Sequence, residues 1–237
     1  MDGELGLDSG LPRGSRLVIW TEWVLATLIG GVGGGVVSLL AAWLVAGYLA
    51  DTIDPTVVLI LAGAAVGAGL GLAQGLVLSR HWRADLWREW TAATVLAVTL
   101  VWPLCLFAWS QTMPTSDTGG APVDLGLLLV ASLLGTLLGA AVGGAQWLVL
   151  RRYQDGTVGW IAVWVLSGLV GVAGGALLLL SYGELADLVG ALGSEQGPAV
   201  EDVLPLWVLA GAVACLIAGV VTGLAMLRVV RPRPPAG

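Results

Sequence analysis

Two glutamines and two glutamates are the side chains of this sequence best placed to do chemistry. Gln74 and Gln146 are the only glutamines inside long apolar stretches, while Glu22 and Glu89 lie at the edges of two others. An amide carries N–H donors and a carbonyl acceptor, so it can join helices by hydrogen bonds or line a polar path. We expect the amides to link helices, with Glu22, Glu89 or a loop backbone as partners. The glutamates, which have arginines close by, are expected to form interfacial ion pairs rather than to act as catalytic acids.

The other reactive side chains give no catalytic or metal-binding pattern. His81, the single histidine, stands between Arg80 and Trp82, a setting typical of an anchor at a membrane edge rather than a ligand. Cys105 and Cys215 both fall inside apolar stretches, where cysteine behaves as a small hydrophobic residue. No set of nucleophile, base and orienting group can be assembled, and no cluster has the spacing of metal ligands. We therefore expect no enzyme activity, no cofactor and no metal site.

The composition of the chain is that of a membrane protein. Of 237 residues, 57% are hydrophobic and 11% are charged, and the mean hydropathy is +0.92. Soluble domains have about 45–50% apolar and about 25% charged residues. In water such a chain would expose apolar patches and aggregate, whereas lipid requires apolar surface along every span. The sequence excludes a soluble domain, indicates the lipid bilayer as a partner, and gives no sign of a nucleic-acid partner.

Six apolar segments free of charge predict six membrane-spanning helices. They lie at about 24–48, 56–79, 91–110, 125–150, 159–181 and 204–227. At about 1.5 Å per residue, each reaches the ~30 Å thickness of the hydrocarbon core. We expect an all-α integral membrane protein, with a six-transmembrane-helix bundle at 17–230 between a disordered tail at 1–16 and a proline-rich tail at 231–237. Ser181 and Glu184, spaced as in a capping box, predict a separate short helix after the fifth span.

All ten arginines are predicted to lie on one side of the membrane. They flank the same ends of the six segments, and the loops near 49–55, 111–124 and 182–203 hold acidic residues but no arginine. Because cytoplasmic loops carry the excess of positive charge, we expect both termini in the cytoplasm. Eight tryptophans cluster near the arginines and are expected to form an aromatic belt at that membrane surface. They are Trp20, Trp23, Trp82, Trp87, Trp90, Trp147, Trp160 and Trp164.

Three segments of the chain align without gaps when they are anchored on Gln74, Gln146 and Met226. They read GLAQGLVL, GGAQWLVL and GLAMLRVV, and arginine follows the anchor in each. The preceding helices repeat as well, since WTEW at 20–23 returns as WREW at 87–90. The repeating unit is a helical hairpin, and the three copies lie near 17–80, 81–152 and 153–230. Three hairpins of one orientation fit either closure around a pseudo-threefold axis along the membrane normal or a linear row.

Glycines recur at every fourth position in the second helix of each repeat. They are Gly63, Gly67, Gly71, Gly135, Gly139, Gly143, Gly211, Gly219 and Gly223. On a helix such glycines form one ridge, and the missing side chains let a neighbouring backbone approach closely. We expect these ridges to pack between helices. The alternative is that the small residues line a narrow path for water or a solute.

The repeated Gly-x-x-Gln-x-Leu-Val-Leu pattern followed by arginine resembles the GxxQWLVLRR segments of uncharacterised bacterial multi-pass membrane proteins. The resemblance covers nearly all of the membrane part and implies a protein of the bacterial cytoplasmic membrane. It implies no activity, because that group has no assigned one. Met226 departs from the pattern by standing where glutamine is expected, which would leave a ring of three amides incomplete.

Two functions fit these observations. The first is a structural or assembly role, in which the bundle is a subunit or scaffold of a membrane complex, with other membrane proteins or further copies of itself as partners. The second is a small passive channel or transporter for water or a neutral solute. Ion-coupled transport usually needs an ionisable residue inside the membrane, and none of the six segments contains a charged one.

Overall fold

The computed structural model describes residues 13–48, 52–110, 125–190 and 200–229, and all of its regular structure is helical. The six helices are α1 (Arg13–Tyr48), α2 (Pro55–His81), α3 (Leu86–Ser110), α4 (Leu125–Leu150), α5 (Gly159–Gly190) and α6 (Val200–Val229). Every apolar segment of the sequence lies within one of them. The protein is an all-helical bundle with the composition of a multi-pass membrane protein.

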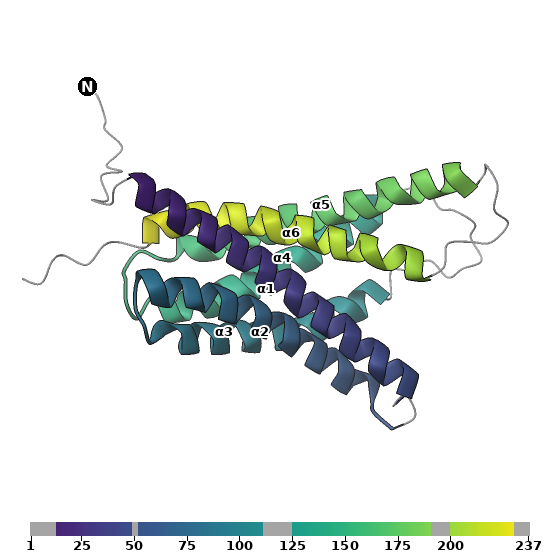
Figure 1. The fold of residues 1–237 in the computed structure, drawn as a ribbon, viewed down its shortest axis with the longest axis horizontal. Coiled ribbons are helices and arrows are strands. Elements are labelled where there is room, and N and C mark those ends of the chain that lie inside the picture. Colours follow the sequence, from purple (N-terminus) through teal and green to yellow (C-terminus); the bar gives the residue numbers. More distant parts are fainter. Residues whose placement is uncertain (1–12, 49–51, 111–124, 191–199, 230–237) are drawn as a thin grey trace, which may run out of the picture.

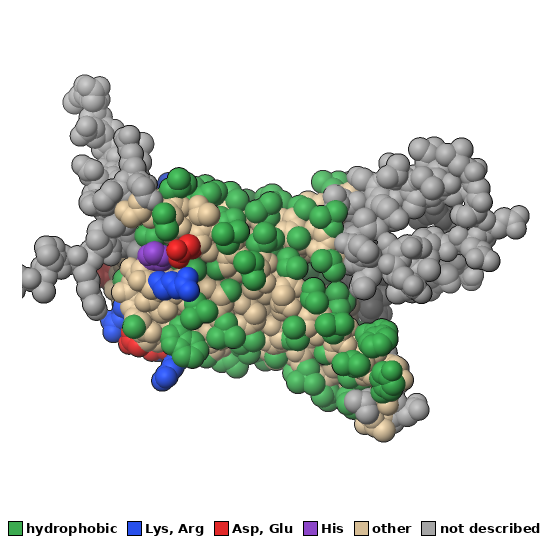
Figure 2. All heavy atoms as spheres, viewed as in Figure 1, with side chains coloured by type: hydrophobic (Ala, Val, Ile, Leu, Met, Phe, Trp, Pro, Cys, Tyr) green, Lys and Arg blue, Asp and Glu red, His purple; other side chains and the backbone are tan. Residues whose placement is uncertain are grey.

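Within the described residues, five of the helices contain stretches long and apolar enough to cross a membrane. These are Ser15–Val45, Pro55–His81, Leu86–Ala108, Leu128–Leu150 and Val208–Arg228. In α5 the apolar stretch among the residues whose side chains the structure describes is Gly159–Gly175. Large apolar side chains point outward along the helices, as Ile29, Leu100 and Leu133 do with about two thirds of their surface exposed. Figure 2 shows this apolar surface along the length of the bundle and charged side chains gathered at one end.

The start of α2 illustrates how local sequence sets a helix boundary. Asp54 is the N-cap, and its side chain accepts a 2.7 Å hydrogen bond from the backbone N–H of Thr56. Pro55 follows at the first helical position, where its missing N–H removes no helical hydrogen bond. The hydrogen bond from Thr56 favours the charged carboxylate and holds the pKa of Asp54 below its usual value.

Two helix boundaries correct the sequence-based predictions. α1 begins at Arg13, so residues 13–16 are helical although the tail was predicted to run to residue 16. α5 continues without a break to Gly190, so the separate short helix predicted from Ser181 and Glu184 is wrong. The reason is the same in both places. Hydropathy marks only the part of a helix that fits the hydrocarbon core, whereas the helical backbone can continue into the polar residues beyond it.

The six helices close into a ring. Each helix packs against its neighbours in chain order, and α6 packs against α1. No other pair of helices brings its backbones together in the part of the chain that the structure describes. We call the end of the bundle that carries Arg16, Arg80, Arg151 and Arg228 the arginine end. In Figure 1 the helices gather there and diverge toward the opposite end, where α1 with α2 and α5 with α6 point in different directions.

Most of the ridge glycines of the even-numbered helices lie against the helix that follows in the ring. A Cβ built on Gly67 of α2 would come within 2.8 Å of the Val95 Cα on α3, and one on Gly71 would lie 3.0 Å from the Thr91 Cα. Gly63 faces Trp102 of α3 in the same way, at 2.9 Å from its Cβ. The backbones of α2 and α3 thus approach so closely that a methyl group would not fit between them.

The other two glycine ridges make equivalent contacts. Gly135, Gly139 and Gly143 of α4 lie against α5, where a Cβ on Gly143 would come within 2.7 Å of the Trp164 Cβ. Gly219 and Gly223 of α6 lie against α1. Gly211 is an exception that corrects the prediction. It is exposed, and a Cβ there would meet nothing within 4 Å, because α6 has left α1 at that height.

Candidate functional site: a polar network around three buried tryptophans

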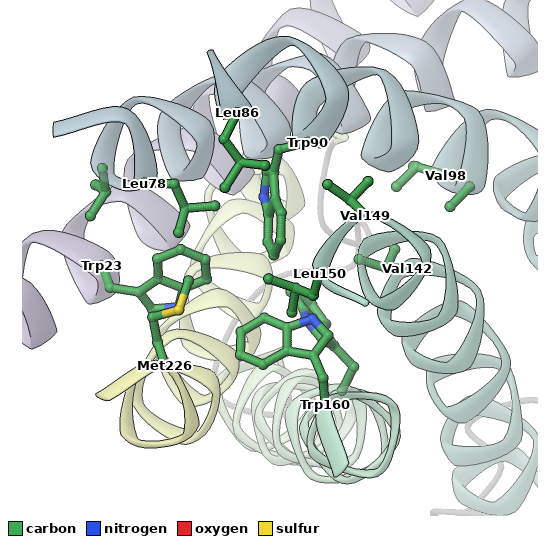
Figure 3. Packing of buried hydrophobic residues seen from close by; sticks show 13 residues of the cluster. Trp23, Leu78, Leu86, Trp90, Val98, Val142, Val149, Leu150, Trp160 and Met226 are labelled. Carbon is green, nitrogen blue, oxygen red and sulfur yellow. The ribbon is translucent and has the colours of Figure 1, made fainter. Parts of the chain in front are cut away.

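Three tryptophans meet inside the arginine half of the bundle. Trp23 of α1 and Trp90 of α3 are completely buried, and Trp160 of α5 is 2% exposed. Their ring centroids are 5.9–6.0 Å apart, and each pair is arranged edge to face. Such pairs stabilise a core by about 0.5–1.5 kcal/mol beyond the burial of their area. In Figure 3 the three side chains point toward one another from different helices. We call them the tryptophan triad.

The triad corrects the prediction of an aromatic belt. Trp23, Trp90, Trp160 and Trp164 were expected at the membrane surface, and all four are buried. Depth along a helix can be estimated from the sequence, but the direction in which a side chain points depends on which face the neighbouring helices cover. A tryptophan near a helix end therefore has the same sequence signature whether it faces lipid or the axis.

Leucines pack the axis between the triad and the arginine end. Leu78 and Leu150 follow the two glutamines by one helical turn, and Leu86 precedes Trp90 by one turn. All three are at most 1% exposed and belong to the same hydrophobic cluster as the triad. This end of the ring is therefore filled by close-packed apolar side chains.

The amide of Gln74 connects α2 to α1 and α3. Its Nε2 donates a 3.0 Å hydrogen bond to Thr27 Oγ1, and its Oε1 accepts one of 3.3 Å from the indole N–H of Trp90. Thr27 in turn donates to the backbone carbonyl of Trp23, 2.9 Å away. Gln74 is completely buried, so these bonds replace the water that the amide loses on folding.

Gln146 repeats this arrangement between α4, α3 and α5. Its Nε2 donates to Thr94 Oγ1 at 3.0 Å, and its Oε1 accepts a 3.1 Å hydrogen bond from the Trp160 indole. The same Nε2 also donates to Gln74 Oε1 at 3.2 Å, which joins the two amides across the ring. Thr94 donates to the carbonyl of Trp90, as Thr27 does to that of Trp23.

The third position of the network uses a different acceptor. Met226, which aligns with Gln74 and Gln146 in the sequence, offers no amide and is 1% exposed. The indole N–H of Trp23 instead donates to Thr222 Oγ1 at 2.9 Å, one turn earlier on α6. Trp164 occupies the place of Thr27 and Thr94, and its buried indole nitrogen has no hydrogen-bond partner. Each indole of the triad thus has an acceptor on the preceding even-numbered helix.

The two glutamates do not take part in this network, which corrects their expected role as partners of the amides. Glu22 lies 2.8 Å from His81, from Oε2 to Nε2, so the histidine is paired across α1 and α2. Glu89 pairs with Arg152 at 3.3 Å and accepts a 3.1 Å hydrogen bond from the Tyr153 hydroxyl. Burial, followed by this bond to Glu89, raises the pKa of Tyr153. Both glutamates precede a triad tryptophan by one residue, and the helical rotation turns them outward.

The chemistry open to these groups is hydrogen bonding among neutral side chains. The described residues contain no group of three or more histidine, cysteine or acidic side chains that could hold a metal. The spacing that marks the network was present in the sequence, because threonine follows a triad tryptophan by four residues at Thr27 and again at Thr94. The hydrogen-bond acceptors of the indoles could not be predicted from the sequence, because each acceptor lies on a neighbouring helix whose position depends on the tertiary structure.

Comparison with known proteins adds no relative to this description. No protein-family model, no curated protein and no solved structure matches the chain.

Proposed function

We propose that this chain is a structural membrane protein, a sealed helical bundle that acts as a subunit or scaffold in a membrane complex. The observation that carries the proposal is the filled axis at the arginine end. The triad and the leucines beside it are almost completely buried, and each triad indole is hydrogen-bonded to a neighbouring helix. Protein interiors are packed as closely as organic crystals, so side chains buried in this way resist rearrangement.

The same packing argues against a path through the ring. A passive channel for water or a neutral solute needs unpaired polar groups that can form hydrogen bonds with the passing molecule in place of bulk water. The acceptor oxygens of Gln74 and Gln146 instead accept from Trp90 and Trp160, and their nitrogens donate to Thr27 and Thr94. A flow of water would have to break these bonds and displace the triad.

We further propose that the ring consists of three hairpin repeats related by a pseudo-threefold axis. Three kinds of contact support this. The triad places one tryptophan from each odd-numbered helix at nearly equal separations. The bonds of Gln74 to Thr27 and Trp90 have counterparts in those of Gln146. The ridge glycines of α2, α4 and α6, apart from Gly211, face the next odd-numbered helix.

The orientation follows from the charges. We propose that the arginine end faces the cytoplasm, with both termini on that side of a bacterial cytoplasmic membrane. Arg80, Arg151 and Arg228 stand at or just beyond the same ends of their helices. At about 1.5 Å per residue, the 36 residues of α1 extend about 54 Å, well beyond the ~30 Å hydrocarbon core. The parts of the long helices outside the hydrocarbon are surfaces on which other subunits could assemble.

Two measurements test the proposal together. Purified protein reconstituted in liposomes is expected to give water and glycerol permeability equal to that of empty liposomes. In mild detergent extracts of its native membrane, the chain is expected to migrate in an assembly larger than its own 24.2 kDa plus the detergent. Flux well above empty liposomes that falls in a folded Gln74→Leu variant would favour the channel instead. Migration as a single free chain would contradict the assembly role.

A further inference from the structure

A surface pocket lies where α4 ends and α5 begins. It has a volume of about 240 Å³ and is lined by Trp147 and Arg151 at the end of α4 and by residues 154–158 of the turn. It is independent of the buried network, and its use as a binding site does not depend on the proposed structural role.

The pocket contains one positive and one negative side chain that are not paired with each other. Arg151 and Asp155 both line it, and both are exposed. The salt bridges among the described residues join His81 to Glu22, Arg83 to Asp85 and Arg152 to Glu89, so neither pocket charge is in one. Arg151 and Asp155 are therefore available to a ligand that carries both signs of charge.

The height of the pocket places it at the surface of the membrane. Trp147 lies in the last turn of the membrane-spanning stretch Leu128–Leu150, and tryptophan is enriched where the hydrocarbon meets the lipid headgroups. The guanidinium of Arg151 lies over the Trp147 ring, 5.0 Å from its centroid. This cation–π contact orients the guanidinium while the planar group keeps N–H donors for a second partner.

We propose that this pocket binds a zwitterionic headgroup that carries a phosphate and a primary ammonium, the chemistry of phosphoethanolamine. Arg151 holds the phosphate, because a guanidinium matches the geometry of two phosphate oxygens. Asp155 accepts a charge-assisted hydrogen bond from the ammonium group. A phosphocholine headgroup has no N–H to donate to Asp155, and a phosphoglycerol headgroup has no cation for it.

The test uses the purified full chain in detergent and native mass spectrometry with added lipids of matched acyl chains. The chain is expected to retain phosphatidylethanolamine severalfold more than phosphatidylcholine. Asp155→Asn is expected to remove this preference while retention of phosphatidylglycerol does not fall. Arg151→Gln is expected to lower retention of both phosphatidylethanolamine and phosphatidylglycerol. Excess soluble phosphoethanolamine shows whether the headgroup alone suffices for binding. Competition indicates that a free headgroup fills the pocket, and retention without competition indicates that the acyl chains of the lipid add to the affinity.

Arg88→Gln is the matched control. Arg88 stacks on Trp87 with its guanidinium 5.4 Å from the ring centroid, much as Arg151 stacks on Trp147, but it does not line the pocket. This variant is expected to bind phosphatidylethanolamine like the parent chain. Equal retention of ethanolamine and choline lipids by the parent, or an equal loss in Arg88→Gln and Arg151→Gln, would overturn the proposal. Thermal unfolding of each variant, expected to match the parent because the altered side chains are exposed, separates lost binding from lost folding.

Discussion

The amide of Gln74 exchanges hydrogen bonds with side chains on three other helices, Thr27 of α1, Trp90 of α3 and Gln146 of α4. In a bundle surrounded by lipid, an apolar side chain gains little by leaving lipid for another helix, because both surroundings are apolar. Hydrogen bonds between helices therefore help to determine which helices pack together. The amide is neutral, so it can be buried here without the cost of desolvating a charge.

Replacement of Gln74 by leucine tests how much this amide contributes to the stability of the fold. The variant leaves the Trp90 indole N–H buried without an acceptor, and a buried unpaired donor costs about 1–3 kcal/mol. We expect the free energy of unfolding in detergent to fall by that amount, measured by denaturant titration followed by tryptophan fluorescence.

Met226→Leu provides the control for that substitution. Met226 stands at the matching position of α6 and is equally buried, but the indole of Trp23 donates to Thr222 instead of to Met226. An exchange of methionine for leucine nearly conserves volume and costs less than about 1.5 kcal/mol. A Gln74→Leu variant no less stable than Met226→Leu would contradict the role assigned to the amide.

At the scale of the helix, the glycine ridges determine how closely the elements approach. A Cβ on Gly139 would collide with the backbone carbonyl oxygen of Trp164 on α5, whereas one on Gly144, five residues along the same helix, would meet nothing within 4 Å. Both positions lie inside α4, so an alanine at either one changes helix propensity in the same way. A difference in stability between the two variants therefore reports the contact with α5.

Alanine at these two positions gives opposite expectations. Gly139→Ala must push α5 away and is expected to lower the thermal unfolding temperature in detergent. Gly144→Ala is expected to leave that temperature unchanged or to raise it, because alanine favours a helix over glycine by about 1 kcal/mol. Two variants of equal stability would show that α4 and α5 do not meet along this ridge.

The apolar segments predicted which parts of the chain are helical, since every helix in a membrane must satisfy its own backbone. They did not predict that α1 starts at Arg13 or that α5 reaches Gly190, because hydropathy carries no information outside the hydrocarbon core. Gly211 shows the corresponding limit for packing. Its spacing fits the ridge, but α1 and α6 diverge toward that end of the bundle, so no neighbouring backbone reaches it (Figure 1).

At the scale of the whole molecule, the side of the membrane on which each end lies can be measured directly. In a chain with Cys105 and Cys215 replaced by serine, we expect a cysteine at Asp117 to react with an impermeant maleimide added to intact cells. A cysteine at Gly237 is expected to react only after the cells are permeabilised. Labelling of both positions in intact cells would contradict the proposed orientation of the arginine end.

Closure of the ring is the property on which the sealed axis depends, and it rests on the contact of α1 with α6. A Cβ on Gly31 would lie 3.4 Å from the Cβ of Cys215, close to the separation of about 3.5–4.5 Å found in disulfides. Gly33, two residues further along α1, is exposed and has nothing within 4 Å of its Cβ position. The pair of positions therefore distinguishes a closed ring from a row of hairpins.

The measurement is a disulfide cross-link in a chain with Cys105→Ser and a protease site inserted between residues 111 and 124. After mild oxidation and cleavage, Gly31→Cys with Cys215 is expected to keep the two fragments joined on a non-reducing gel, and a reductant is expected to separate them. Gly33→Cys is expected to give separate fragments under both conditions. Separate fragments for Gly31→Cys, or equal joining of the two variants, would contradict a ring in which α6 closes against α1.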